Sequence, residues 1–398
     1  MLIGRVRGAR TAEHPDGCDL VLRDGRVVSA EPASSGAGGT VLDVAGRVVL
    51  PAFVDAHVHL DKAFAPGSVP AELPAVLAAM AAQRTATPLT ETARRARRAV
   101  DALVRNGTTA ARVQVEIDPT HGLGLLVLHQ RLADAVDDRL AVQLVAFPQN
   151  GLEATGMAAL MAAALDEGAD VVGGCPYVDD DPAAHLDIVF GLADRYHAPV
   201  DLHLDFGDDP AASLIGLVAE RTVAHGMAGQ VTIGHVTTLA AMDPYTQALA
   251  LETLAAQGIS LVVLPATDLW LTGHGEPGTR SVAPYERARG AGVRTAIGNN
   301  NIANPFAPYG NASQLQAAWL AGLVRRSADA AGLLAAVTAE PSAILGLEPH
   351  GTRPGEWADL VVLDHDDVSD ALLQAPPVHQ VLRRGRLVPP WLPAPVTG

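Results

Sequence analysis

Residues 50–62 read LPAFVDAHVHLDK. The apolar and β-branched run at 53–58 predicts a buried strand, and the histidine pair His57 and His59 stands at its end. Side chains two positions apart on an extended chain point to the same side, so these two imidazoles can bind one metal ion. The pair alone is weak evidence, because a chain with 14 histidines contains a His-x-His by chance about every second time. Its meaning depends on the sequence around it.

Further short apolar runs follow this one and are separated by segments of helical period. Gly107 and Gly168 stand where helix C-caps are expected, after the helical segments 89–106 and 152–168. Buried parallel strands that alternate with helices predict an α/β fold, a (β/α)8 TIM barrel over residues 51–347, with its chemistry at the C-terminal strand ends. The eight runs are 53–58, 110–115, 141–147, 170–172, 200–204, 231–233, 259–264 and 294–297.

The two ends of the chain, 1–50 and 348–398, read instead as short strands with glycine-centred turns. Segment 21–28 places Gly25 between apolar runs, and segment 381–388 repeats this pattern around Gly385. We therefore expect a composite β unit built from both termini, in which the two ends pair in one sheet.

The composition excludes several classes of protein. There are 28 basic and 44 acidic residues, and the formal charge of −16 repels nucleic acid. The apolar runs are too short for a membrane span, and no signal-peptide pattern is present. Two cysteines cannot form a disulfide framework, which favours a reducing, cytoplasmic location. We expect neither nucleic acid nor membrane as a partner.

Two more histidines, His203 and His235, stand at the predicted ends of the fifth and sixth strands. We expect them to meet His57 and His59 at the same rim of the barrel. The only lysine of the chain, Lys62, follows this histidine pair closely. A lysine amine can lose a proton, whereas arginine cannot, so Lys62 is a candidate for chemistry.

Together with the segments around them, these residues resemble the amidohydrolase superfamily, and more narrowly its cytosine deaminase-like branch. The matching segments run in order over nearly the whole chain: 50–62, 106–112, 145–151, 168–173, 201–203 and 355–363. The resemblance implies a distorted barrel with a small β-sandwich formed by both termini. It implies one divalent metal, zinc or iron, and no organic cofactor. Its implied site residues are His57, His59 and His203 as metal ligands, His235 as the residue that orients the attacking water, and Gln149 as the reader of the substrate's amide edge.

Two positions depart from that pattern. Phe206 stands where the family has a proton-shuttling glutamate, and Asn300 stands where it has the aspartate that binds the metal and deprotonates water. An amide lacks the charge and the basicity of a carboxylate, and a phenyl ring carries no proton. Loss of a general acid or base costs about 10²–10⁴ in rate, so the usual route of hydrolysis is expected to be crippled.

Other residues near the predicted strand ends can take over proton transfer. We expect Asp205, Glu116 and Lys62 to act with His235 as catalytic residues. We expect the substrate to contact Gln149, Phe206, Asp268, Asn299, Asn300 and Asn301. Arg112 lies inside an apolar strand, and we expect it to form a structural ion pair with Glu116 or Asp61.

These patterns predict an enzyme that acts on a C–N bond of a small nitrogen heterocycle, cyclic amide or amidine, with a modified metal centre. The acidic balance favours a neutral or cationic small-molecule substrate, and relatives of this type are often homo-oligomers. One alternative is a metal-independent enzyme that catalyses a cyclisation, dehydration or isomerisation in the same pocket. The other is a non-catalytic relative that only binds a ligand.

Overall fold

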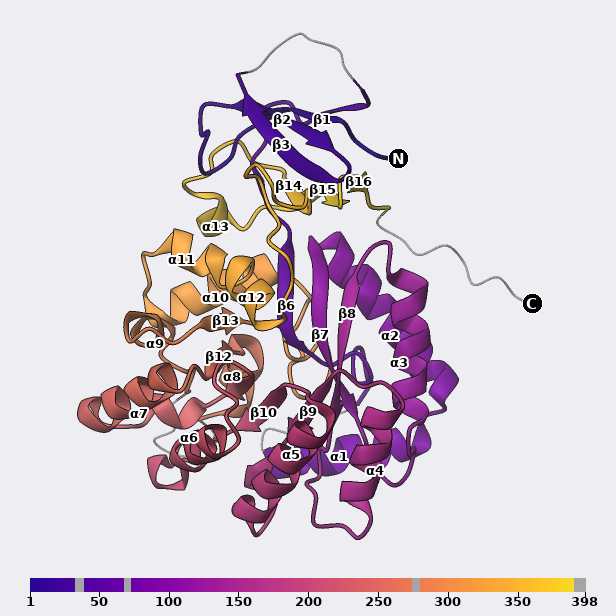
Figure 1. Cartoon of the computed structure of the whole chain (residues 1–398), viewed down its shortest axis with the longest axis vertical. Coiled ribbons are helices and arrows are strands. Elements are labelled where there is room, and N and C mark those ends of the chain that lie inside the picture. The colour runs from indigo at the N-terminus through magenta and orange to yellow at the C-terminus, as the bar shows by residue number, and fades with distance from the viewer. Residues whose placement is uncertain (33–38, 68–72, 274–279, 390–398) are drawn as a thin grey trace.

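The computed structural model describes residues 1–32, 39–67, 73–273 and 280–389 (Figure 1). Its centre is an eight-stranded sheet in which each strand pairs in parallel with the next along the chain. The expected α/β barrel is therefore confirmed. Its strands are β6 (Phe53–Val58), β7 (Thr108–Glu116), β8 (Ala141–Phe147), β9 (Val171–Gly174), β10 (Val200–Leu204), β11 (Val231–His235), β12 (Ser260–Val263) and β13 (Thr295–Ile297).

Backbone hydrogen bonds between the last and first strand segments close this barrel. The amide of Asn300 donates to the carbonyl of His57 over 2.8 Å, and the amide of His59 donates to the carbonyl of Asn300 over 2.7 Å. The closure lies just beyond β13 and at the end of β6, so it brings the 298–301 segment directly beside the histidine pair.

Helices surround the barrel and cover it with their apolar faces. On α2, for example, Ala96, Ala99, Val100 and Leu103 recur at helical spacing and are buried. The helix expected from residue 152 begins only at Met157, after Gly156 with a φ of 87°. The helices are α1 (Leu73–Ala86), α2 (Leu89–Arg105), α3 (Gly124–Val136), α4 (Met157–Asp166), α5 (Pro182–Tyr196), α6 (Ile215–Ala224), α7 (Pro244–Ala256), α8 (Pro265–Leu271), α9 (Tyr285–Gly290), α10 (Gln314–Arg325), α11 (Ala330–Ala335), α12 (Ala339–Ile344) and α13 (Ala371–Gln374), with 3₁₀ turns η1 (Pro176–Val178), η2 (Pro210–Ala212) and η3 (Thr237–Ala240).

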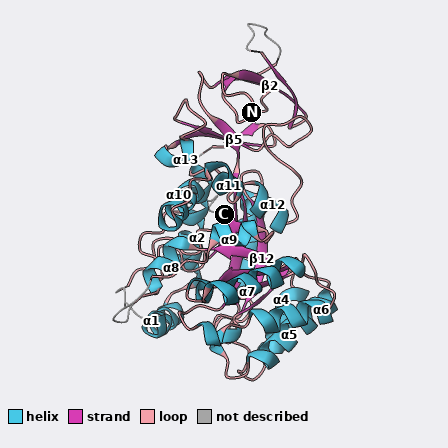
Figure 2. Ribbon diagram, turned by 90° about the vertical axis from the view of Figure 1, so that its left-hand side faces the viewer, coloured by secondary structure: helices cyan, strands magenta, loops and turns pink. Residues whose placement is uncertain are grey.

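The two ends of the chain form two four-stranded sheets beyond one end of the barrel (Figure 2). One sheet contains β1 (Arg5–Ala9), β2 (Cys18–Arg23), β3 (Arg26–Glu31) and β4 (Val41–Asp43). The other contains β5 (Val49–Pro51), β14 (Leu360–Leu363), β15 (Val378–Arg383) and β16 (Arg386–Leu387). Apolar side chains of both sheets, such as Leu20 and Val362, share one core.

The expectation that both ends pair in one sheet is therefore wrong for most of the N-terminal segment. Of the N-terminal strands, β5 joins the C-terminal sheet, where Leu50 pairs with Val361, and Leu2 forms an isolated bridge with Arg386 of β16. The other N-terminal strands complete a sheet of their own, because packing two sheets face to face buries both apolar faces. Residues 33–38 and 390–398 of the expected β unit lie outside the described residues.

The chain leaves β5 and enters the first barrel strand, β6, after a single residue, Ala52. The carboxyl end of β6 therefore points away from the terminal sheets, and the histidines lie at the far rim of the barrel. In the part of the chain that the structure describes, no helix has both the length and the apolar character needed to cross a membrane.

Candidate active site

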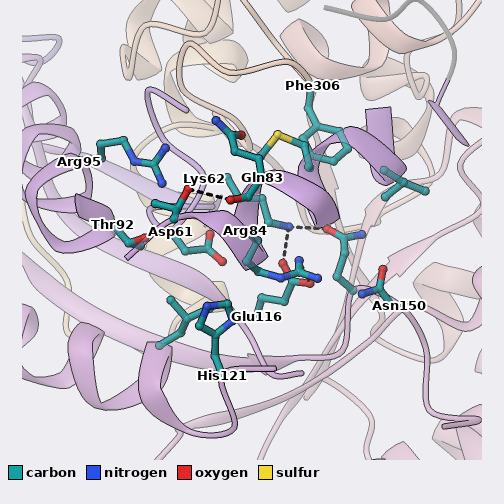
Figure 3. A pocket seen from close by; sticks show the side chains of 15 residues that line it. Asp61, Lys62, Gln83, Arg84, Thr92, Arg95, Glu116, His121, Asn150 and Phe306 are labelled. Carbon is teal, nitrogen blue, oxygen red and sulfur yellow. Dashed lines mark hydrogen bonds and ion pairs between the residues drawn. The ribbon is translucent and has the colours of Figure 1, made fainter. Parts of the chain in front are cut away.

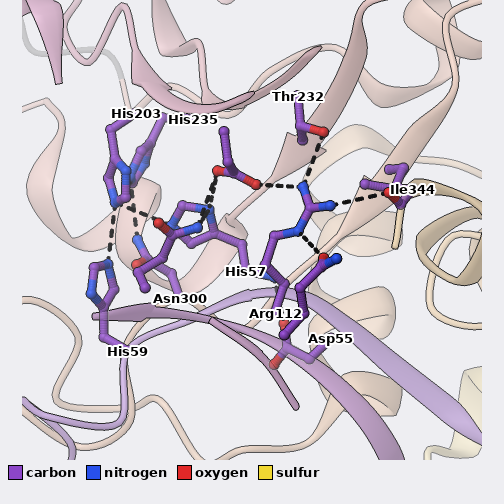
Figure 4. A network of polar contacts seen from close by, with 12 residues as sticks. Asp55, His57, His59, Arg112, His203, Thr232, His235, Asn300 and Ile344 are labelled. Atoms are coloured by element: carbon purple, nitrogen blue, oxygen red, sulfur yellow. Dashed lines mark hydrogen bonds and ion pairs between the residues drawn. The ribbon is translucent and has the colours of Figure 1, made fainter. Parts of the chain in front are cut away.

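Four histidine side chains meet at the carboxyl rim of the barrel (Figure 4). The Nε2 atoms of His57 and His203 lie 3.1 Å apart, and those of His59 and His203 lie 3.2 Å apart. His235 completes the group, with its ring centroid 5.3 Å from that of His203. The structure thus brings together the four histidines that the sequence placed at strand ends.

Three of these rings, His57, His59 and His203, have the geometry and the charge state that a divalent metal needs. Burial lowers the pKa of His57 and lowers the pKa values of His59 and His203 further, so the rings are neutral ligands. Lone pairs on nitrogens this close repel one another unless a proton or a cation lies between them. The three imidazoles therefore fit a metal with an N₃ ligand set.

Asp201 positions the His57 ring from beneath. Its Oδ1 lies 3.7 Å from Nδ1 of His57 and accepts a hydrogen bond of 3.1 Å from the Gln114 amide. Burial alone would raise the pKa of Asp201, but the hydrogen bond to His57 and the charge of Arg112 outweigh burial and lower it. A carboxylate behind a ligand histidine fixes the ring's orientation and raises its basicity.

Arg112 supports this carboxylate, which corrects the partner expected from the sequence. Its Nη1 donates to Asp201 Oδ2 over 2.8 Å, and neither Glu116 nor Asp61 is its partner. The guanidinium also donates to Gln143, Thr232 and the carbonyl of Ile344 (Figure 4). Arg112, Gln114 and Glu116 are two positions apart, so their side chains point to the same side of β7, into the barrel. Arg112 comes first of the three and therefore lies below the rim, next to Asp201.

Asn299 does not lie where a substrate-binding residue was expected. Its amide donates to Asp55 Oδ2 over 2.8 Å, which turns the side chain away from the rim. Asp55 is fully buried, and burial raises its pKa to about 7 despite hydrogen bonds from Asn299 and the His57 backbone. These contacts hold the 298–301 segment against β6.

His235 forms a buried pair with Asp268. The His235 Nδ1–H donates to Asp268 Oδ1 over 2.6 Å, which leaves Nε2 as the acceptor nitrogen of the ring. Burial raises the pKa of Asp268, and the facing His235 offsets this only in part. Asp268 was expected to contact the substrate, but it is a positioning residue for His235. The Asn300 amide lies 3.4 Å from His235 Nε2, and the edge of Phe206 packs against the same ring.

A cavity that is partly open to solvent lies beside this group. Lys62 and Gln149 share a short hydrogen bond at its edge, and Leu77, Leu271 and Phe306 give it apolar walls. Among the described residues that line this cavity, none is an aspartate or a glutamate. The lining residues are His59, Lys62, Leu73, Leu77, Gln149, Tyr177, His203, Phe206, His235, Thr267, Leu271, Asn300, Asn301 and Phe306.

Asp205, expected to transfer protons, points elsewhere. It has a φ of 50°, so the strand alternation of β10 ends there and the side chain turns away from the histidines. Its carboxylate accepts hydrogen bonds from Ser213, the Leu214 amide and Thr238. Asp205 therefore holds the following loop in place, and its carboxylate is not available to a substrate beside the histidines.

Glu116 lines an adjoining second cavity instead of the one beside the histidines. It accepts a short hydrogen bond from Arg84, and its Oε2 lies 3.4 Å from Lys62 Nζ. Burial raises the pKa of Glu116, and the two cations offset this only in part.

Sequence reasoning missed several site residues. Asp55 and Asp201 each stand two positions before a rim histidine, so strand alternation alone could have marked them as inward-facing. Tyr177 and Phe306 come from segments without a strand, and no local pattern in the sequence marks them.

The chain is similar to proteins of known activity over nearly its whole length. A pterin deaminase from Rhizobium rhizogenes (strain K84 / ATCC BAA-868) is 28% identical over 94% of this chain and 88% of its own length. An N-isopropylammelide isopropyl amidohydrolase from Pseudomonas sp. (strain ADP) is 26% identical over 96% of both chains.

Solved structures agree with this similarity. The 5-methylcytosine deaminase from Klebsiella pneumoniae liganded with phosphonocytosine superposes with a TM-score of 0.90 at 26% identity and covers 97% of this chain and 98% of its own. An N-isopropylammelide isopropylaminohydrolase from Burkholderia multivorans ATCC 17616 gives a TM-score of 0.85 at 28% identity, over 98% of this chain and 99% of its own. The sequence model of the Amidohydrolase family matches residues 71–389, well over half of the chain, so this protein belongs to the amidohydrolase family.

Proposed function

We propose that this protein hydrolyses a carbon–nitrogen bond of a small nitrogen heterocycle, cyclic amide or amidine. The observation that carries the proposal is the meeting of three neutral imidazoles, at His57, His59 and His203, beside a fourth that is paired with a carboxylate. The relatives named above act on pterin, N-isopropylammelide and 5-methylcytosine, which are compounds of this class.

His57, His59 and His203 would hold a divalent metal, zinc or iron. When bound, such an ion supplies Lewis-acid chemistry: it lowers the pKa of water to about 7 and polarises the carbon that is attacked. Three imidazoles suffice for a catalytic zinc site, so Asn300 in place of an aspartate does not remove it. Asn300 Oδ1 is buried and has no hydrogen-bond partner among the described residues, so it is available as a neutral oxygen donor to the ion or the substrate.

His235 would move the proton. Its Nε2 is the acceptor nitrogen of the ring and faces the cavity beside the Asn300 amide, while Asp268 holds Nδ1–H and stabilises the protonated ring. The ring can therefore accept a proton at Nε2 from the attacking water and return it to the departing nitrogen. Phe206 carries no proton, so a single histidine has to serve both steps.

The rest of the cavity would orient the ring. Gln149 and Asn301 offer amide groups to a heterocycle edge, and Leu77 and Phe306 cover its faces. Carboxylates at the barrel mouth had favoured a neutral or cationic substrate. Asp205 and Asp268 bond to other protein groups and are not among the residues that line the cavity, and Lys62 is the one lysine or arginine among its described lining residues. A neutral heterocycle is therefore the better fit.

The test combines metal analysis with isotope labelling. We expect close to one zinc or iron per chain, loss of turnover of heterocyclic amines or amides on chelation, and one ¹⁸O from labelled water in the product. A His203→Asn variant should lose the metal, while the exposed Arg94→Gln variant should keep it. Turnover in metal-free protein without ¹⁸O incorporation would contradict the proposal.

That contrary result would favour a second candidate, a metal-independent cyclisation, dehydration or isomerisation. The observation in its favour is that no carboxylate is among the described residues lining the histidine cavity. His235 with Asp268 would then supply all the acid–base chemistry.

A further inference from the structure

A second cavity, drawn in Figure 3, is partly open to solvent and shares lining residues with the one beside the histidines. Lys62, Leu77, Gln149 and Phe306 line both cavities, so the two are neighbours with these four side chains between them. Helices α1 and α2 supply much of the second wall. Its described lining residues beyond the shared four are Asp61, Met80, Gln83, Arg84, Thr87, Thr92, Arg95, Glu116, His121, Leu125 and Asn150.

Asp61 is a buried carboxylate without a partner in this second cavity. Its residue is 6% exposed, and both carboxylate oxygens are buried with no hydrogen-bond partner among the described residues. Buried polar groups in folded proteins are nearly always hydrogen-bonded, and an unpaired buried charge is costly. The described residues therefore leave Asp61 without hydrogen-bond donors, and another molecule has to supply them.

Arg95, from α2, complements it. Its residue is 5% exposed, and its buried Nε has no hydrogen-bond partner in the described part of the chain. Burial lowers the pKa of Arg95, and the charges of Glu91 and Asp61 offset this only in part, so Asp61 lies within electrostatic range of Arg95. No direct hydrogen bond between them is present among the described contacts, and both line the same space.

The other charges of this cavity form ion pairs with one another, although Glu116 Oε2 and Arg84 Nε also lack a hydrogen-bond partner among the described residues. Glu116 accepts from Arg84 and lies 3.4 Å from Lys62 Nζ, while Arg84 Nε lies 3.3 Å from Asp118. Asp61 and Arg95 are thus left as one acceptor and one donor of opposite charge that face a shared cavity.

We propose that the second cavity is a subsite for a neutral, polar substituent of the substrate. Hydroxyl or amide N–H donors of the substituent would bind Asp61, and its acceptor oxygen would face Arg95. This inference rests on the proposed function, which places the heterocycle beside the histidines, and it adds that the ring carries a side chain that passes Lys62. A substituent without net charge fits because the charges of Asp61 and Arg95 balance.

Two probes that differ only in the substituent test this subsite: N-isopropylammelide and its N-(2,3-dihydroxypropyl) analogue. Calorimetric Kd and kcat/KM are measured for both with the metal-loaded protein. We expect the dihydroxypropyl compound to bind about tenfold or more tightly, because hydrogen bonds to charged groups are strong. In Asp61→Asn this preference should shrink to about twofold, with the Kd of N-isopropylammelide unchanged.

Two further variants guard against a folding effect. Thr92→Leu narrows the cavity without touching either charge and should also remove the preference, whereas Asp187→Asn, on the outside of α5, should keep it. Equal binding of the two probes, no measurable binding of either, or a preference that survives both Asp61→Asn and Thr92→Leu would overturn the subsite. If the preference depends on Asp61 but neither probe is turned over, the subsite is upheld and hydrolysis is contradicted. Equal turnover of both probes would support hydrolysis and contradict the subsite.

Discussion

At the scale of single residues, the site depends on residues held in backbone conformations that a free chain avoids. His235 has a φ of 69° and Asn300 a φ of 57°, and both are in the left-handed region. Such conformations cost of order 1–3 kcal/mol and persist only where the surroundings impose them. Here the backbone bonds of Asn300 to His57 and His59, and the Asp268 contact of His235, supply that constraint.

The first prediction concerns Asp268. Asp268→Asn replaces the carboxylate by a neutral amide that can also donate to Nδ1, so the His235 tautomer is no longer fixed and the protonated ring loses its counter-charge; kcat should fall about 10²–10⁴-fold with KM changed less than about threefold. Steady-state kinetics and metal content are the measurements, and the metal should stay bound. Asp205→Asn is the matched comparison. That carboxylate is also buried, just after β10, but it accepts a hydrogen bond from a loop amide and not from His235. An equal kcat loss in both variants would reduce Asp268 to a structural residue.

The second prediction concerns Asn300. Asn300→Asp adds a negative charge to a cluster of neutral imidazoles, so zinc affinity measured against a chelator should rise about tenfold or more. The metal-free variant should have a lower Tm than the parent, because the new carboxylate is then buried without a partner. Unchanged affinity would mean that residue 300 lies outside the ligand sphere.

At the scale of elements, close strand packing shapes the histidine cluster. A Cβ added to Gly234 on β11 would lie 3.2 Å from Nδ1 and 3.3 Å from Cε1 of His57. Glycine at this position therefore leaves the room that the His57 ring needs between β6 and β11.

Gly234→Ala should displace the His57 ring and weaken zinc binding about tenfold, with a loss of about 1–3 kcal/mol in stability from overpacking. Chelator competition and denaturant unfolding measure the two effects. Gly216→Ala on α6 is the control, since no atom lies within 4 Å of its added Cβ, and it should be neutral or slightly stabilising. Parent-like zinc affinity in Gly234→Ala would show that the ring tolerates the methyl group.

Helix α3 carries a pH-sensitive group remote from the rim histidines. His129 donates from Nδ1 to the Leu125 carbonyl over 2.7 Å, and burial lowers its pKa. The folded protein therefore binds fewer protons at His129 than the unfolded chain does, so stability is full above the unfolded pKa of about 6.5 and is lost as pH falls below it.

His129→Asn keeps a donor near Leu125 but does not titrate. Between about pH 7.5 and about pH 5.5 its free energy of unfolding should fall less than that of the parent, by up to about 1.4 kcal/mol per pH unit below 6.5. Urea titrations at the two pH values measure this difference. Parallel losses in parent and variant would assign the acid sensitivity to other groups.

At the scale of the whole molecule, one ion pair ties the barrel together. Arg112 of β7 contacts Gln143 of β8, Asp201 of β10, Thr232 of β11 and the carbonyl of Ile344 at the end of α12. A single guanidinium thereby joins the lower barrel interior to the carboxylate that supports His57.

Arg112→Met should destabilise the protein by about 3–5 kcal/mol, because Asp201 is left charged and buried without its partner. Chemical denaturation measures the loss. Arg94→Met removes an exposed pair with Glu91 and should cost no more than about 0.5 kcal/mol. Similar values for the two variants would mean that Asp201 finds other donors when Arg112 is absent.

Local patterns in the sequence determined the barrel strands and the meeting of His57, His59, His203 and His235. The reason is that strand period and strand end are properties of neighbouring residues, and in a parallel barrel all strand ends reach one rim. The same logic extends to Asp55 and Asp201, which precede rim histidines by two positions.

Only the tertiary structure decided the partners of charged groups and the direction of side chains beyond the strand ends. Arg112 meets Asp201 across the barrel, Asp205 turns into a loop, and most N-terminal strands form a sheet of their own. Asp61 and Arg95 line the same cavity without a direct bond, although no local pattern relates them. Such pairings depend on how distant segments close around a common space, and local periodicity carries no information about that closure.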